Sequence, residues 1–283
     1  MTLDLNWIPI ADPGDARLGP FLHLPLRKAT GQLTEGQFIA EGRLVVERLL
    51  RCRYRTDALL VSASKVNWAS QTVLAAANER EELRTVPIYV LPDQILSAVV
   101  GFEFHSGIMG CGHRALPEVL QRQMLGWFAS VPTVVKRETL IVLPAMNSAE
   151  NLGSIIRSGH GLGAAGLVLS NRSADHLSRR VIRVSMGHAL AFPCWRTDDW
   201  VGDLQRLRTA GFRLIGVEHH PRMQLLNTAK RYERQALVFG NEFDGLDETT
   251  LSMMDDIVGL EMHHSVDSLN VAVTTAIALH HFV

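Results

Sequence analysis

Short, wholly apolar segments alternate with helical segments along the second half of this chain. Because a strand that is apolar along its whole length is buried on both faces, such strands are typical of parallel sheets with helices on both sides. The alternation predicts an α/β fold with a mostly parallel sheet. The expected strands are 140–144, 166–170, 212–217, 236–239 and 257–260, and the expected helices are 151–161, 174–186, 200–210 and the segment from Leu269.

The first half repeats this alternation on a smaller scale. Residues 1–36 are rich in Pro, Gly and Asp and predict an extended arm with one short helix. A helix is expected from Gln37, strands at 58–62, 87–91 and 107–111, and helices at 73–82 and from Pro92. With 283 residues the chain is long enough for two domains. We divide it into an N-terminal arm (1–36), a smaller α/β domain (37–115), a linker (116–137) and a larger α/β domain (138–283).

The charge of the chain is balanced, with a net value of −1, so no global polycation points to a nucleic-acid partner. The basic residues are nevertheless mostly arginines, which bind phosphate through a planar fork of donors. Two interpretations stay open for the arginine clusters: a contact with nucleic-acid phosphates, or a solvated surface. The clusters are Arg48, Arg51, Arg53 and Arg55 in the first half, and Arg172, Arg179, Arg180 and Arg183 in the second.

The cysteines and histidines indicate neither a disulfide framework nor a metal site. Cys52, Cys111 and Cys194 lie far apart, and neighbouring histidines such as His219 and His220 point apart, which makes them poor chelators. The first residues lack the blocks of a signal peptide, and no apolar run approaches the ~18 residues of a membrane-spanning helix. We expect a soluble, cytoplasmic protein with no metal and no membrane partner.

The segment Gly161–Gly166 satisfies the GxGxxG pattern of dinucleotide-binding proteins. In those proteins the glycines follow a strand and open a helix. Here they follow the predicted helix 151–161 and precede the predicted strand 166–170. An NAD-dependent oxidoreductase is therefore kept only as a remote alternative.

The segment from Ser265 to Leu279 passes abruptly from small and polar residues into an apolar helix. Ser268 is expected to cap this helix near its start at Asn270, because a Ser hydroxyl there accepts a backbone N–H. The N–H groups of a helix start also bind anions or the polar edge of a ligand. Taken alone, the segment indicates a capped, buried helix.

Two upstream segments change this interpretation. The first is Asn151-Leu-Gly-Ser-Ile-Ile-Arg157, and the second contains Phe239-Gly-Asn-Glu242. In this order, with Ser268-Leu-Asn270-Val as the third motif, they resemble the SpoU (TrmH-like) RNA ribose methyltransferases of the SPOUT superfamily. The resemblance covers the chain from about Leu140 onward. Residues 38–42 and 107–113 resemble, more loosely, the substrate-binding domain of that family, which is similar to ribosomal RNA-binding proteins.

The resemblance implies methyl transfer from S-adenosylmethionine to a ribose 2'-hydroxyl of structured RNA. The separate N-terminal domain somewhat favours ribosomal RNA over transfer RNA. The resemblance also implies a deep trefoil knot, a rare exception to unknotted folding, and a homodimer with its active site near the subunit interface. The candidate catalytic residues are Asn151, Arg157, Glu242, Ser268 and Asn270. The candidate donor-binding residues are Phe239, Gly240, Asn241, Leu260, Ser268 and Leu269, and the candidate RNA contacts are Arg48, Arg51, Arg53, Arg55 and Arg172.

The chemistry requires the donor and the hydroxyl to be held in line while a proton is removed. Arg157 is the candidate cation that stabilises the developing alkoxide. The family proposal makes the matching arginine a general base, which is physically awkward because Arg keeps its proton to a pKa above ~12. Asn151, six residues before Arg157, is not on the same helix face, so we expect it on the loop entering the helix, where it orients Arg157 or the ribose.

Each motif taken alone also fits a structural role: a surface ion pair at Arg157, and a tight turn with an exposed acid at Glu242. A non-catalytic RNA-binding factor on the same fold is the alternative to an enzyme. The chain departs from the family pattern at Gly159 and His160, where many relatives have Ala and Asp, and at Phe243, where glycine is common. These departures bear on the expected substrate rather than on the reaction.

Overall fold

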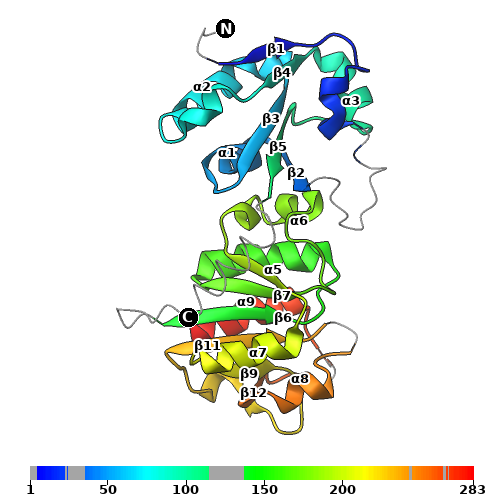
Figure 1. Ribbon diagram of the computed structural model, residues 1–283. Helices are drawn as coiled ribbons and strands as arrows, with labels where there is room; N and C mark the ends of the chain where they lie inside the picture. The colour runs from blue at the N-terminus through cyan, green and yellow to red at the C-terminus, as the bar shows by residue number, and fades with distance from the viewer. Residues whose placement is uncertain are drawn as a thin grey trace. The chain divides into compact units, whose positions relative to one another are not determined.

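The chain forms two compact units (Figure 1). The N-terminal unit comprises Met1–Leu116 with Leu177–Ala191, and the C-terminal unit comprises Pro117–His176 with Phe192–Val283. The computed structural model describes residues 5–22, 24, 36–114, 137–241, 244–263, 266 and 268–283. Most of the predicted linker lies outside the described residues, and the predicted domain boundaries stay a prediction.

The N-terminal unit is built on a five-stranded mixed sheet with the order β1-β4-β3-β5-β2. Strands β1, β4 and β3 are parallel, and β5 runs antiparallel to its neighbours β3 and β2. The strands are β1 (Trp7–Pro9), β2 (Gln37–Glu41), β3 (Arg55–Ser62), β4 (Ile88–Leu91) and β5 (Ile108–His113). The α-helices are α1 (Arg43–Arg51), α2 (Val66–Ala77), α3 (Asp93–Val100) and α6 (Arg179–Val184).

Three sequence predictions for this unit are corrected. The helix expected from Gln37 begins only after Gly42, because residues 37–41 form β2 and pair with β5. The helix expected at 73–82 is α2, which begins earlier, and the predicted arm contributes β1, which pairs with β4.

The close packing of β5 requires glycine, because a Cβ at Gly112 would lie 2.4 Å from the Phe38 ring.

The C-terminal unit contains a seven-stranded sheet with the order β10-β12-β9-β11-β6-β7-β8, and every pair of neighbouring strands is parallel. The strands are β6 (Glu138–Leu143), β7 (Gly166–Ser170), β8 (Cys194–Thr197), β9 (Arg213–Val217), β10 (Gln224–Leu225), β11 (Arg234–Phe239) and β12 (Asp256–Gly259). The helices are α5 (Ala149–Leu162), α7 (Trp200–Thr209), α8 (Glu248–Ser252) and α9 (Val271–Phe282).

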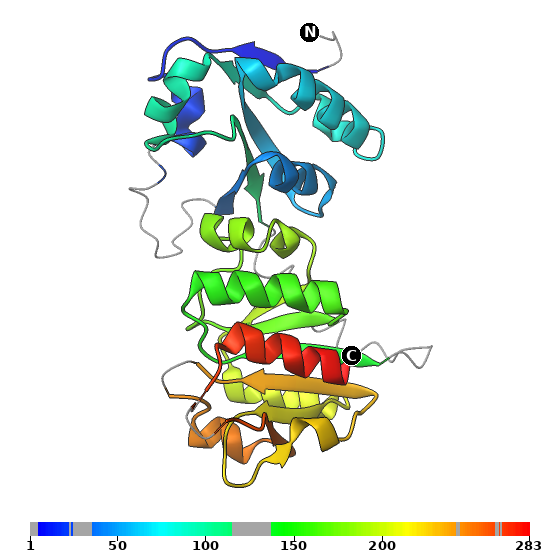
Figure 2. The ribbon, with the colours of Figure 1, turned by 180° about the vertical axis from the view of Figure 1, so that it is seen from behind.

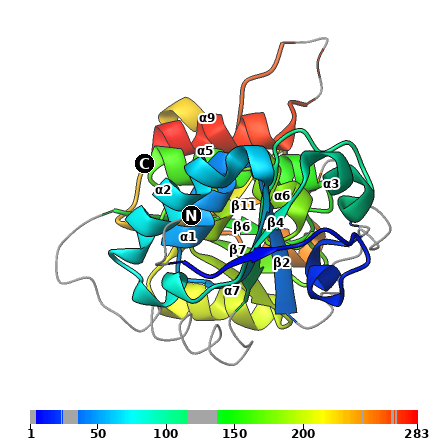
Figure 3. The same cartoon turned by 90° about the horizontal axis from the view of Figure 1, so that it is seen from above.

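Helices cover both faces of this sheet, as the apolar strands predict. Helices α5 and α9 lie side by side on one face, and α7 lies on the other (Figures 2 and 3). On the α7 side, Leu204 and Leu207 pack against strand residues such as Leu140 and Val238. The observed α/β fold with a parallel sheet therefore confirms the predicted class.

The predictions fail where strands lie at the edges of the sheet or helices are short. Strands β8 and β10 were not predicted, because an edge strand is not apolar along its whole length, and Arg196 of β8 is exposed. Helix α8 was also missed, and within the helix expected at 174–186 only Arg179–Val184 is α-helical. Gly163 ends α5 with a φ of 90°. The GxGxxG segment therefore begins inside the last turn of a helix and ends at the start of β7, which argues against a dinucleotide site.

Candidate active site

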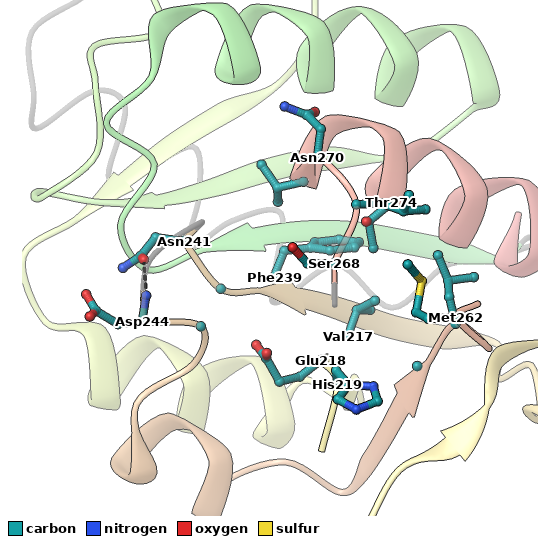
Figure 4. Close-up of a pocket in the computed structure, with 16 residues that line it drawn as sticks. Val217, Glu218, His219, Phe239, Asn241, Asp244, Met262, Ser268, Asn270 and Thr274 are labelled. Atoms are coloured by element: carbon teal, nitrogen blue, oxygen red, sulfur yellow. Dashed lines mark hydrogen bonds between the residues drawn. The ribbon is translucent and has the colours of Figure 1, made fainter. Parts of the chain in front are cut away.

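A cavity of about 550 Å³ lies beyond the carboxyl ends of β9, β11 and β12, next to the start of α9 (Figure 4). This volume is typical of small-molecule sites, and the carboxyl ends of parallel strands are where ligands bind in open α/β sheets. All six candidate donor-binding residues line the cavity, together with Asn270. The sheet thus brings the second and third motifs together at one site.

The described residues of the second motif, 239–241, lie at the end of β11 and directly after it. Asn241 pairs with Gly245 across the loop, and its side-chain Oδ1 accepts a hydrogen bond of 2.7 Å from the Asp244 N–H (Figure 4). A Cβ at Gly240 would lie 2.3 Å from the Gly245 carbonyl carbon, so only glycine fits there. Glu242 and Phe243 lie outside the described residues.

The third motif begins α9, and its cap differs from the prediction. Asn270, not Ser268, caps the helix: its Oδ1 accepts hydrogen bonds from the Ala272 N–H at 2.9 Å and the Val273 N–H at 3.4 Å. The helix begins at Val271, which places Ser268 too far upstream to cap it. Ser268 lines the cavity instead, and its side chain points into it (Figure 4).

The first motif lies on α5 and is joined directly to the third. The Asn270 Nδ2 donates a hydrogen bond of 3.0 Å to the Asn151 Oδ1. The expectation that Asn151 lies on the preceding loop is wrong, because Ser148 caps α5 and accepts the Asn151 N–H at 3.2 Å, which places Asn151 in the first helical turn. Arg157 is exposed farther along α5 and is not among the cavity-lining residues.

The departures at Gly159 and His160 serve the packing of α5. Gly159 is buried, and a Cβ there would lie 2.6 Å from Ile141 of β6. The His160 ring stacks on Phe192 with a centroid distance of 5.6 Å. Neither residue lines the cavity.

Glu218 lines the cavity and was missed by the sequence analysis. It directly follows β9, is half-buried, and accepts the Leu246 N–H at 3.1 Å through Oε2. Burial raises the pKa of this carboxyl group above its ordinary value. The available signal was an acidic residue directly after a wholly apolar parallel strand, where the chain enters the ligand-binding edge of the sheet.

The candidate RNA-binding arginines lie in both units, and each has a partner. In the N-terminal unit, Arg48 donates to the Met186 carbonyl, Arg51 lies 3.4 Å from Glu47, Arg53 donates to the Tyr54 hydroxyl at 3.3 Å, and Arg55 lies 2.7 Å from Asp57. In the C-terminal unit, Arg172 lies 3.9 Å from Asp247. Their role in RNA binding stays a prediction.

The described part of the chain contains neither a candidate membrane span nor a candidate metal-binding cluster. None of its helices combines the length and the apolar character needed to cross a membrane. The same residues contain no group of three or more His, Cys, Asp or Glu side chains that could hold a metal ion.

Solved structures share this fold. An AdoMet-bound rRNA methyltransferase from Sinorhizobium meliloti is 21% identical, with a TM-score of 0.76 over 98% of this chain and 97% of that one. The SpoU methyltransferase AviRb from Streptomyces viridochromogenes, in complex with AdoMet, is 22% identical, with a TM-score of 0.73 over 94% of this chain and 97% of that one. At these identities the likeness establishes the fold alone.

Sequence comparisons establish the family. The model of the SpoU rRNA Methylase family matches residues 138–280. A protein from Mycobacterium bovis named as an uncharacterized tRNA/rRNA methyltransferase is 34% identical over 278 residues, which cover 96% of this chain and 90% of the relative. The three motifs and the fold agree with this match. The chain belongs to the SpoU rRNA Methylase family and is an S-adenosylmethionine-dependent RNA methyltransferase.

Proposed function

We propose that this methyltransferase acts on a ribose 2'-hydroxyl of structured RNA, with ribosomal RNA favoured over transfer RNA. The observation that carries the proposal is the hydrogen bond between Asn151 and Asn270, which joins the first motif to the third beside the cavity. A relative from Streptomyces laurentii named as a 23S rRNA (adenosine(1067)-2'-O)-methyltransferase supports the choice of reaction. It is 32% identical over 143 residues, which cover 50% of this chain and 52% of the relative.

The donor is proposed to lie in the cavity, against the backbone of Gly240, Leu260 and Leu269. The missing side chain at Gly240 lets the backbone pack closely against Gly245 beside the cavity, and Phe239 and Asn241 flank it on the same wall. The Ser268 hydroxyl points into the same space (Figure 4) and is able to donate or accept a hydrogen bond. An apolar wall with a few placed polar groups suits a nucleoside-containing ligand.

The end of the cavity at which the methyl group is transferred is called the transfer end, and it is proposed to lie beside the starts of α5 and α9. Asn270 holds Asn151 in place through its side-chain amide. Arg157 contributes a fixed positive charge that stabilises the alkoxide and clamps an RNA phosphate. Glu242 is assigned a ligand-orienting or catalytic role through its place in the second motif.

A homodimer is proposed because α9 exposes an apolar stripe. The exposed fractions are 49% for Val273 and 39% for Ile277, which are four residues apart and therefore lie on one side of α9. Leu269, just before the helix, is 41% exposed. A second copy that covers this stripe would complete the site near Asn270.

We expect Val273→Asp to convert a dimer into a monomer in sedimentation equilibrium, because it places a charge in the apolar stripe. A wild-type protein that sediments as a monomer contradicts the proposed dimer.

We also propose a knotted backbone in the C-terminal unit and RNA contacts at the arginine clusters. The trefoil knot is proposed for the segment from β11 to α9, which carries the second and third motifs. RNA is proposed to contact the arginine clusters, where phosphates compete with the present partners of exposed side chains such as Arg51 and Arg55. The cytoplasm is proposed as the place of action.

The test is transfer of labelled methyl groups from S-adenosylmethionine to total bacterial RNA, followed by digestion to nucleosides. We expect the label in 2'-O-methylated nucleosides, predominantly from the ribosomal fraction. Label on a base contradicts the ribose assignment. Incorporation into no RNA pool contradicts catalysis and favours the non-catalytic RNA-binding alternative.

A further inference from the structure

The floor of the cavity carries a carboxylate that belongs to none of the three motifs. Glu218 follows β9, which lies between β12 and β11 in the sheet, so its side chain starts from the middle of the cavity floor. Figure 4 shows the Glu218 carboxylate pointing into the space below Ser268, whereas the carboxylate of Asp244 points away from it. Glu218 is therefore the better placed of these two acids to meet a bound ligand.

The position of this carboxylate is fixed by the loop after β11. Oε2 accepts the Leu246 N–H at 3.1 Å, and a Cβ at Gly245 would lie 2.9 Å from each carboxylate oxygen. The side chain therefore lies flat against the Gly245 backbone, which has a φ of 66°. A carboxylate offers about four lone-pair sites, so it keeps acceptor capacity for a ligand after it has accepted backbone N–H groups.

Burial makes such a ligand contact favourable. The pKa of Glu218 is raised by desolvation, although the N–H groups of Leu246 and His219 and the nearby imidazoles of His219 and His220 act in the opposite direction. The backbone bonds thus do not fully replace the lost hydration of the carboxylate. Hydroxyl donors from a ligand would supply the missing hydrogen bonds.

The parts of the donor can be assigned along the cavity. Val217, Leu260 and Met262 supply an apolar wall suited to an adenine ring, and Asn270 with Asn151 marks the transfer end. The ribose joins these two parts of the donor. A carboxylate at the end of a parallel strand is well suited to bind ribose hydroxyls, as in dinucleotide-binding folds.

We propose that Glu218 binds the ribose diol of the methyl donor and makes the site selective for an intact ribonucleoside. This inference rests on the proposed location of the donor in the cavity. It assigns a side-chain contact to the donor in addition to the backbone contacts of Gly240, Leu260 and Leu269.

The test is calorimetric binding of S-adenosylhomocysteine and its 2'-deoxy and 3'-deoxy ribose analogues to wild-type protein and to Glu218→Gln. Glutamine keeps an oxygen for the Leu246 N–H but loses the charge and one acceptor oxygen. We expect wild type to prefer S-adenosylhomocysteine over at least one deoxy analogue by about tenfold or more, and the variant to lose most of this preference. Glu233→Gln is the matched control, since Glu233 is exposed just before β11, and it should bind as wild type does.

Three outcomes overturn the inference. Equal weakening for S-adenosylhomocysteine and both deoxy analogues means that Glu218 acts only by holding the loop. Unchanged binding to Glu218→Gln excludes the contact. If 5'-methylthioadenosine, which keeps the ribose but lacks the amino acid, binds the variant and wild type equally, the carboxylate binds the donor's ammonium group instead. Wild-type protein that binds no S-adenosylhomocysteine contradicts the proposed donor site itself, which separates the two failures.

Discussion

In the C-terminal unit, polar side chains have different partners at the two ends of the parallel strands. At the amino ends, polar groups bond to one another. Arg213 lies 2.8 Å from Asp256, Arg234 lies 2.8 Å from Glu138, and the buried Gln235 amide donates to Thr139 at 2.9 Å and to the carbonyl at the end of α9 at 2.8 Å.

At the carboxyl ends of the same strands, polar groups face a cavity. Gly240 and Gly245 pack closely against each other in the cavity wall, and Glu218 and Ser268 point into the cavity (Figure 4). Under the proposed function, the amino ends stabilise the fold, whereas the carboxyl ends bind the donor. Substitutions at the two ends should therefore have separable effects on unfolding and on methyl transfer.

The largest effect is expected for Gly240→Ala. The new methyl group would overlap the Gly245 backbone, so the loop must shift and the donor site is distorted. Displacements of about 1 Å cost on the order of 100-fold in activity, and we expect at least this loss in methyl transfer together with weakened S-adenosylhomocysteine binding. Gly161→Ala is the matched control, because a Cβ at Gly161 meets nothing within 4 Å. Normal donor binding by a folded Gly240→Ala protein contradicts the placement of the donor.

The next effect is expected for Arg157→Ala. Loss of an electrostatic stabiliser of the transition state lowers the rate by roughly 100- to 1,000-fold, while donor binding should stay nearly intact because Arg157 does not line the cavity. Arg157→Lys should recover part of the rate, since it keeps the charge but lacks the planar fork. Single-turnover rates and donor affinity are the two measurements. A folded Arg157→Ala protein that no longer binds the donor refutes the role assigned here.

At the amino ends, Gln235→Ala should reduce stability without reducing transfer. The substitution leaves the buried Thr139 hydroxyl and the α9 carbonyl without their donor, which costs about 1–3 kcal/mol in the free energy of unfolding. The measurements are the free energy of unfolding in denaturant and the rate of methyl transfer at a temperature where the variant is folded, each compared with wild type. A specific loss of transfer in the folded variant breaks the proposed separation of the two ends.

The smallest effect concerns acid stability at Asp256. The hydrogen bond from Arg213 lowers the pKa of this carboxyl below its ordinary 3.8. The stabilisation is therefore fully present above that value and is lost as the pH falls through the lower pKa of the folded state. Asp256→Asn should be less stable than wild type at neutral pH by up to about 1 kcal/mol, and the difference should shrink in strong acid. A difference that is independent of pH contradicts this origin.

The sequence predicts the strands that are buried on both faces, because their apolar runs are unbroken. It does not predict β8 and β10, whose places at the sheet edges remove that pattern. The motifs identify seven of the sixteen described residues that line the cavity, but the choice of Asn270 over Ser268 as the cap depends on where α9 begins, which the sequence pattern does not fix to the residue. Glu218 lies in none of the three motifs, and the sequence signal for it is its place directly after the apolar strand β9. Its position in the cavity depends on how the carboxyl ends of β9, β11 and β12 come together in the sheet.

The most direct test is a map of ribose methylation in the RNA of a strain that lacks the gene for this chain. The proposed function predicts that one 2'-O-methyl group is lost, that wild-type protein restores it, that Gln235→Ala restores it at a permissive temperature, and that Arg157→Ala does not. An unchanged methylation map would contradict the assignment of ribose methylation to this protein, and restoration by Arg157→Ala would contradict the catalytic role proposed for Arg157.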